Sequence, residues 1–112
     1  MTVSTESFAI HTLEDAPAPG RAALERLKKG VGMIPNLAGS MAASPTLIDA
    51  FVTLRGISQA GSFTPLEREV LSLANAVTNG CRYCQAIHST FALAGGLDEA
   101  SVAAIRAGGT PS

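Results

Sequence analysis

The sequence predicts an all-α fold, a compact bundle of five to six short helices, on two observations. First, 46% of the 112 residues are hydrophobic, yet there is no Trp and only one Tyr, so the core is expected to come from Ala, Leu, Val, Ile and a few Phe. Strands favour β-branched and aromatic residues, whereas Ala is the strongest helix former. Second, apolar residues recur at helical spacing between Gly and Pro. A chain of this length has a marginal core, so we expect an obligate oligomer.

The chain is expected to begin with a segment outside the helical bundle. Residues 1–17 are polar and irregular and are predicted to be an N-terminal arm or linker, and residues 18–112 are predicted to form a single helical domain. The N-terminus lacks the basic start and the long apolar stretch of a signal peptide. The longest charge-free run, residues 30–48, is interrupted by Pro35 and Pro45 and is not a membrane span. We therefore expect a soluble, cytoplasmic protein.

Two helices are expected in the first part of this domain. The first lies in GRAALERLKKG, residues 20–30, where Leu24 and Leu27 share a face and Gly30 offers a stop. A loop that contains proline should then lead into a short apolar helix ending near Ala43.

The next two helices are predicted from their N-terminal signals. Ser44 and Thr64 each supply a hydroxyl N-cap and are followed by proline at the first helical position. Thr64 and Glu67 also have the spacing of a capping box. These signals predict helices at about residues 45–60 and 65–78.

The helix over residues 65–78 carries an apolar stripe at offsets of about 0, 4, 7, 8 and 11 residues. Its members are Leu66, Val70, Leu73, Ala74 and Val77. Asn79 and Gly80 are expected to supply the left-handed residues that end this helix. Asp98 is expected to cap a last short helix, EASVAAIRA.

Both cysteines lie in the segment NGCRYCQAIH, residues 79–88. A helix should start at or just after Cys81 and run to about Ala94. At about 100° per residue, Cys84 lies about 60° and His88 about 20° from Cys81, so the three side chains project to one side of this helix. Unpaired amides in a first helical turn stabilise a thiolate. One sulfur could then attack an oxidant while the other closes a disulfide, with the histidine as proton acceptor.

Other roles for these groups remain open on spacing alone. Cysteine and histidine can be ordinary buried residues. A zinc site would use both thiolates and His88, with a fourth ligand from Glu69, His11 or another subunit; otherwise His11 is expected to be solvated. Attachment of c-type haem needs His where Gln85 stands. In a reducing compartment a redox dithiol is favoured, and we expect no cofactor and no metal.

The helix before the cysteines offers two carboxylates, Glu67 and Glu69. Either could face the cysteine pair if the two helices pack antiparallel across the short turn between them. Glu67 already has a capping role, and Glu69 lies at the margin of the apolar stripe. Helix geometry alone does not choose between them.

A larger pattern, Glu-x11-Cys-x2-Cys-x3-His, runs through Glu69, Cys81, Cys84 and His88. The segment LEREVLSLANAVTNGCRYCQAIHSTFALAGG resembles the carboxymuconolactone decarboxylase and alkylhydroperoxidase D-like family, and the resemblance covers about residues 31–107. It implies an all-α fold whose copies assemble into homo-trimers or homo-hexamers. It also selects Glu69 as the carboxylate of the site.

The resemblance further implies an activity. In members with this motif, the dithiol reduces hydroperoxides and is recycled by a dithiol donor such as a lipoylated protein. Here Cys84 and Cys81 would be the reactive pair, and His88 and Glu69 the proton relay. Cys84 is our choice for the attacking thiolate because it lies beside His88; the opposite order stays open, since Cys81 is nearer the helix N-terminus. Tyr83 stands where some peroxidase members have His, which weakens the relay, because a phenol with a pKa of about 10 is a poor base.

Two other functions are considered. The first is the family's decarboxylase chemistry, which needs no dithiol and should need several converging cations, whereas only Arg68 and Arg82 lie near the motif. The second is a non-enzymatic oligomeric module that uses the dithiol as a redox sensor. The net charge of -1 and the lack of a basic patch give no reason to expect a nucleic-acid or membrane partner.

Overall fold

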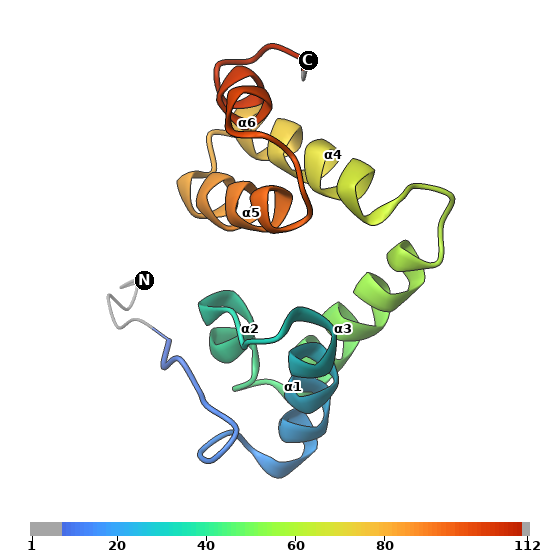
Figure 1. The fold of residues 1–112 in the computed structure, drawn as a ribbon. Coiled ribbons are helices and arrows are strands. Elements are labelled where there is room, and N and C mark those ends of the chain that lie inside the picture. Colours follow the sequence, from blue (N-terminus) through green and yellow to red (C-terminus); the bar gives the residue numbers. More distant parts are fainter. Residues whose placement is uncertain (1–7, 111–112) are drawn as a thin grey trace. The chain divides into compact units, whose positions relative to one another are not determined.

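The computed structural model describes residues 8–110, which contain six α-helices and no strand. The helices are α1 (Ala18–Val31), α2 (Asn36–Met41), α3 (Pro45–Gln59), α4 (Pro65–Thr78), α5 (Arg82–Ala94) and α6 (Glu99–Arg106) (Figure 1). This confirms the all-α prediction. The chain divides between Ala60 and Gly61 into two units, with α1 to α3 in the first and α4 to α6 in the second. That residues 18–112 form a single domain stays a prediction.

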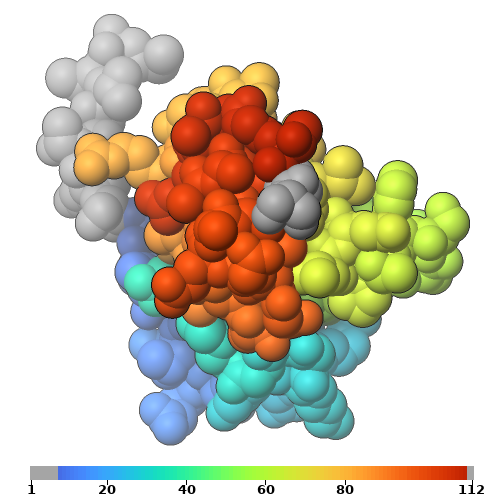
Figure 2. Space-filling view, turned by 45° about the horizontal axis from the view of Figure 1, so that its top comes forward, coloured from blue at the N-terminus to red at the C-terminus, as the bar shows by residue number. Residues whose placement is uncertain are grey.

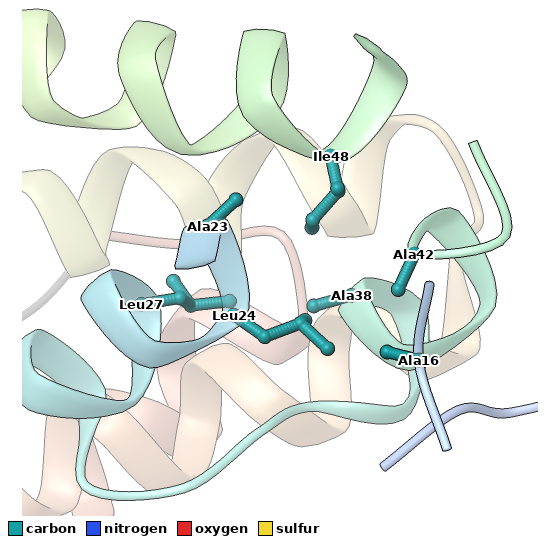
Figure 3. Close-up of a cluster of buried hydrophobic side chains, with 7 residues drawn as sticks. All are labelled: Ala16, Ala23, Leu24, Leu27, Ala38, Ala42 and Ile48. Carbon is teal, nitrogen blue, oxygen red and sulfur yellow. The ribbon is translucent and has the colours of Figure 1, made fainter. Parts of the chain in front are cut away.

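The first unit has a small core of Ala, Leu and Ile side chains (Figure 3). The buried members come from α1, α2, α3 and the segments beside them: Ala16, Ala23, Leu24, Leu27, Ala38, Ala42 and Ile48. Leu24 and Leu27 therefore share the buried face, as predicted. Within the predicted arm, residues 1–7 lie outside the described part, and residues 8–17 form no helix. Ala16 nevertheless belongs to this core, so the end of that segment packs on the unit.

The ends of α1 differ from the prediction. Residues 20–30 were expected, and the helix extends over Ala18–Val31. Gly30 lies inside this helix. A glycine commonly ends a helix where its backbone is left-handed, and Gly30 does not have a positive φ. Gly32 makes that turn with a φ of 88°, and its N–H donates to the Lys28 carbonyl at 2.7 Å.

The segment before α1 crosses α2 at a glycine. The His11 N–H donates to the Gly39 carbonyl at 3.0 Å. A Cβ at Gly39 would lie 2.8 Å from the His11 carbonyl oxygen, so this close approach requires glycine. His11 was expected to be solvated, but its side chain is 21% exposed, and its Nδ1 lies 3.4 Å from Asp15.

The helices α3 and α4 begin at the capping residues that were predicted from the sequence, Ser44 and Thr64. The Thr64 hydroxyl accepts the Glu67 N–H at 3.2 Å, and the Glu67 carboxylate accepts the Thr64 N–H at 2.8 Å, which completes the capping box. The Ser44 hydroxyl accepts the Leu47 N–H at 3.3 Å. These interactions depend on neighbouring residues only, which is why the sequence reveals them.

The second unit packs its three helices around one cluster. Its buried members are Leu73, Ala92, Val102 and Ile105, and Val70 and Leu97 pack against them. Figure 2 shows the orange and red surface of α6, which contacts both α4 and α5. The predicted apolar stripe of α4 is wrong at Ala74, which is exposed, while Ala76 is buried. The backbone carbonyl of Ala76 accepts the Cys81 N–H in the turn that leads into α5.

A tight turn reverses the chain between α4 and α5. Asn79 and Gly80 were both predicted to be left-handed, but Asn79 has a φ of -86° and only Gly80, at 63°, is left-handed. The Cys81 N–H then donates to the Ala76 carbonyl at 2.9 Å. The two helices therefore run antiparallel, which places the start of α5 beside the end of α4.

None of the helices within residues 8–110 has the length and apolar character needed to cross a membrane.

Candidate functional site

The two cysteines lie at the start of α5 and are joined by a disulfide, with their Cα atoms 5.3 Å apart. Cys81 is the N-cap of the helix, and Cys84 lies in its first turn. The Cys81 sulfur accepts the Cys84 N–H at 3.2 Å. A hydroxyl or carboxylate usually satisfies this amide at a helix N-terminus. The sequence correctly placed the two sulfurs within reach of each other, and both residues are half-buried.

The second element of the site is a carboxylate–imidazole pair between α4 and α5. The Nδ1 atom of His88 lies 2.7 Å from Oε2 of Glu69, and the side chains are 29% and 25% exposed. An ionised carboxylate can only accept hydrogen bonds, so Nδ1 carries the proton in this contact. In neutral His88 the opposite nitrogen, Nε2, is then an acceptor.

Packing of the two helices distinguishes Glu69 from Glu67. Glu69 lies on the face of α4 that meets α5, because its carboxylate contacts His88 on that helix. Glu67 is exposed and accepts the N–H of Thr64 at the start of α4. The structure therefore brings Glu69, and not Glu67, to His88, as the resemblance implied.

Phe91 is a neighbour of the site that was not predicted from the sequence. Its ring lies edge-on to the His88 ring, with centroids 6.2 Å apart and planes at 75°. The two residues are three positions apart on α5, the spacing at which side chains meet on a helix. This three-residue spacing is the feature of the sequence from which Phe91 could have been predicted as a neighbour of His88. Phe91 thus forms an aromatic contact with the imidazole of the site.

The residues around the cysteines differ in exposure. Arg82 and Tyr83, between the two cysteines, are exposed. Gln85 is half-buried, and its Nε2 lies 3.5 Å from the Ala76 carbonyl, which also accepts the Cys81 N–H. Gln85, whose place in the sequence excludes haem attachment, therefore lies against the turn that positions Cys81.

The groups named for a zinc site form other contacts: Cys81 bonds to Cys84, and Glu69 contacts His88. Within residues 8–110, no three His, Cys, Asp or Glu side chains are grouped so that they could hold a metal ion. Glu69, one of the possible fourth ligands, contacts His88, and His11, the other, contacts Asp15 in the first unit.

A comparison with known protein families identifies the family to which the chain belongs. The model of the carboxymuconolactone decarboxylase family matches residues 45–111, more than half of the chain, and spans α3 to α6 with the whole site. The chain belongs to the carboxymuconolactone decarboxylase family. This confirms the resemblance found through the Glu-Cys-Cys-His pattern. A comparison with curated proteins found no match. The family includes enzymes, and membership fits a peroxidase-like or a decarboxylase-like role; the catalytic roles of the four residues stay predictions.

Proposed function

We propose that the protein is a thiol-dependent peroxidase, a disulfide oxidoreductase that reduces hydroperoxides through Cys81 and Cys84. The observation that carries the proposal is the combination, in one unit, of a bonded cysteine pair and a His88–Glu69 contact of 2.7 Å. A dithiol supplies two electrons, and a carboxylate-oriented imidazole moves protons.

Cys84 is the thiol that attacks the hydroperoxide. It lies one turn before His88, where residues four positions apart share a helix face, and Nε2 can take its proton. The thiolate attacks one peroxide oxygen: an S–O bond forms, the O–O bond breaks, and the alcohol leaves with a proton from the imidazolium. Cys84 is then a sulfenic acid. The Cys81 sulfur displaces its hydroxyl group as water and closes the disulfide observed here.

A dithiol electron donor, such as a lipoylated protein, returns the site to its reduced form. Its two thiols supply two electrons and two protons, and the donor becomes a disulfide. The family resemblance supports this donor class and a homo-trimeric or homo-hexameric assembly. The proposal places the protein in the cytoplasm, where such reductants are available.

Decarboxylation is the weaker alternative. A multiply anionic substrate should need converging cations, but Arg68 donates to the Phe63 carbonyl at 2.8 Å, and Arg82 is exposed. A Cys81→Ser, Cys84→Ser double variant separates the two functions, because decarboxylation should survive it and peroxide reduction should not.

The deciding experiment counts thiols by alkylation and mass spectrometry before and after one equivalent of cumene hydroperoxide. Reduced wild type should lose both thiols rapidly, and Cys84→Ser should keep Cys81 free. Addition of dithiothreitol should then give repeated turnover in wild type. If both thiols of wild type stay free, the proposal is wrong. If the disulfide forms but does not turn over, the protein is a redox sensor instead.

A further inference from the structure

The two sulfurs of the disulfide have different surroundings. Cys81 is the N-cap of α5, and its sulfur already accepts the Cys84 N–H at 3.2 Å. The amides of the first helical turn have no partner within the helix, and the helix dipole adds partial positive charge there. Cys84 lies inside that turn as a helical residue, and its backbone N–H is the donor to the Cys81 sulfur.

The position of Cys81 does not depend on the bond to Cys84. The Cys81 N–H donates to the Ala76 carbonyl at 2.9 Å, and the Cys81 carbonyl accepts the Gln85 N–H at 3.0 Å. The Gln85 side-chain amide lies 3.5 Å from the same Ala76 oxygen. Backbone bonds on both sides of Cys81 therefore hold it as the N-cap. When the disulfide opens, a Cys81 thiolate remains at the helix end with the Cys84 amide beside it.

The stability of each thiolate determines how the disulfide is reduced. In thiol–disulfide exchange, the attacking thiolate bonds to one sulfur and the other leaves as a thiolate, and the more stable thiolate leaves faster. A helix N-terminus stabilises a thiolate. The geometry therefore makes Cys81 the better leaving group.

We propose that the reducing partner bonds to Cys84 and that Cys81 leaves as a thiolate held by the N-terminus of α5. This inference rests on the proposed function, because it describes the recycling step of the same site. The donor thiolate forms a new S–S bond to the Cys84 sulfur, and the Cys81–Cys84 bond breaks with its electron pair on Cys81. The second donor thiol then attacks the donor's own sulfur, which makes the donor a cyclic disulfide.

This second exchange releases the Cys84 thiolate last, one turn from His88, where the next hydroperoxide is reduced. A more stable thiolate is a weaker nucleophile. Cys81 is thus suited to leave and Cys84, with His88 as its base, to attack. One cycle uses each sulfur for the step that its position favours.

The test identifies the sulfur that carries the reductant. Oxidised full-length protein is mixed with 2-mercaptoethanol, a monothiol that cannot complete the second exchange, and is quenched with acid at a series of short times. Free thiols are alkylated, and the protein is digested without reduction. Trypsin cleaves after Arg82, so Cys81 and Cys84 fall on separate peptides. Mass spectrometry then measures the adduct on each.

At the earliest times, the adduct on Cys84 should exceed that on Cys81 by about tenfold or more, the ratio for a leaving-group difference of about 1.4 kcal/mol in the transition state. A predominance of adduct on Cys81, or equal amounts, overturns the inference and leaves the peroxidase proposal standing. If neither 2-mercaptoethanol nor dithiothreitol opens the disulfide, both fail. If the adduct forms on Cys84 but cumene hydroperoxide does not oxidise the reduced protein, only the peroxidase proposal fails.

A second measurement does not depend on trapping an intermediate. In Cys84→Ser the Cys81 thiol is alone, and in Cys81→Ser the Cys84 thiol is alone. Iodoacetamide reacts with thiolates, so its rate against pH reports thiolate stability. Alkylation of Cys81 should persist to lower pH than alkylation of Cys84. The reverse order overturns the inference.

Discussion

Glu69 and His88 come from different helices, and their contact gives the first prediction at the scale of single residues. Because Glu69 accepts a hydrogen bond from Nδ1, it leaves Nε2 of His88 as the proton acceptor. Glu69→Gln removes the charge that favours this tautomer and the imidazolium. We expect kcat/KM for cumene hydroperoxide to fall by roughly 10²-fold, the usual contribution of a general base. Steady-state turnover with dithiothreitol as reductant measures it.

Glu67→Gln is the matched control for this change. It removes the same charge from the same helix, but Gln still serves in a capping box. Turnover should stay within about twofold of wild type, a change of about 0.4 kcal/mol. If the two variants lose activity equally, the contact between Glu69 and His88 is not part of the relay.

The site was predictable only as far as one helix determines it. Cys81, as N-cap, and Cys84 are joined at the start of α5, as the helical period predicts, and the grouping of His88 with them stays a prediction. The choice of Glu69 needed either the family resemblance or the packing of α4 on α5, because a helical wheel of α4 alone cannot show where its neighbour lies. The sequence also did not specify whether Cys81 is the N-cap or the first residue of α5, because that depends on the backbone of the preceding turn.

At the scale of elements, two glycines in the first unit give predictions of opposite sign. A Cβ at Gly39 would meet the His11 carbonyl oxygen at 2.8 Å, whereas a Cβ at Gly56 has no neighbour within 4 Å. Gly39→Ala should lower the free energy of unfolding by about 1–3 kcal/mol through overpacking. Gly56→Ala, inside α3, should raise it by about 0.5–1 kcal/mol through better helix propensity.

Urea denaturation followed by circular dichroism measures both glycine variants, and the oligomeric state is checked at the same protein concentration. Each variant is the control for the other, because the chemical change is identical. If Gly39→Ala is as stable as wild type, the segment before α1 does not hold the close approach to α2 described here.

The N-cap of α6 predicts a dependence of stability on pH. Hydrogen bonds from the Ser101 N–H and hydroxyl, at 2.8 and 2.9 Å, lower the pKa of Asp98 below its ordinary value near 3.8. Because the pKa of Asp98 is lower in the folded chain than in the unfolded chain, the ionised carboxylate stabilises the folded chain above a pH of about 3.8. This contribution is lost as the pH falls through the lowered pKa. Asp98→Asn should be less stable than wild type at neutral pH, and the difference should shrink in acid.

Thermal melts at a pH of about 7 and a pH of about 2.5 test this sign. Glu25→Gln, on the exposed surface of α1, is the control for a change in net charge and should shift stability by less than about 0.5 kcal/mol at either pH. A difference between Asp98→Asn and wild type that grows in acid contradicts the explanation.

The helix boundaries show which elements a sequence specifies. Ser44, Thr64 and Asp98 cap helices at the predicted places because each bond joins residues three positions apart. The end of α1 was missed, because Gly30 and Gly32 are equally permissive and only the direction of the following loop selects Gly32. The α4 stripe was wrong at Ala74 and did not include Ala76, because the burial of each position depends on the helices that pack against α4.

At the scale of the whole molecule, the chain has little core for its length. The two units have separate buried clusters, and that of the first is built largely from Ala. Leu54 and Ile57 on α3 are 63% and 66% exposed and line a groove of about 590 Å³. Contiguous exposed apolar patches mark interaction surfaces, and Leu54 and Ile57 lie three positions apart on α3, where side chains meet. The expected homo-oligomer would bury such surface and add to stability.

The last prediction concerns this assembly. Wild type should sediment as three or six copies, and its melting temperature should rise with protein concentration, because association stabilises only the folded chain. The double variant Leu54→Glu, Ile57→Glu places two charges on the exposed face of α3 without touching the core. Charges buried at an interface without partners cost several kcal/mol, so the variant should dissociate to smaller species at micromolar concentration. Sedimentation equilibrium measures the mass, and circular dichroism checks that helicity is retained. If the variant keeps the wild-type mass, α3 lies outside the interface; if wild type itself is monomeric at all concentrations, the marginal core is sufficient alone and the expected oligomer is wrong.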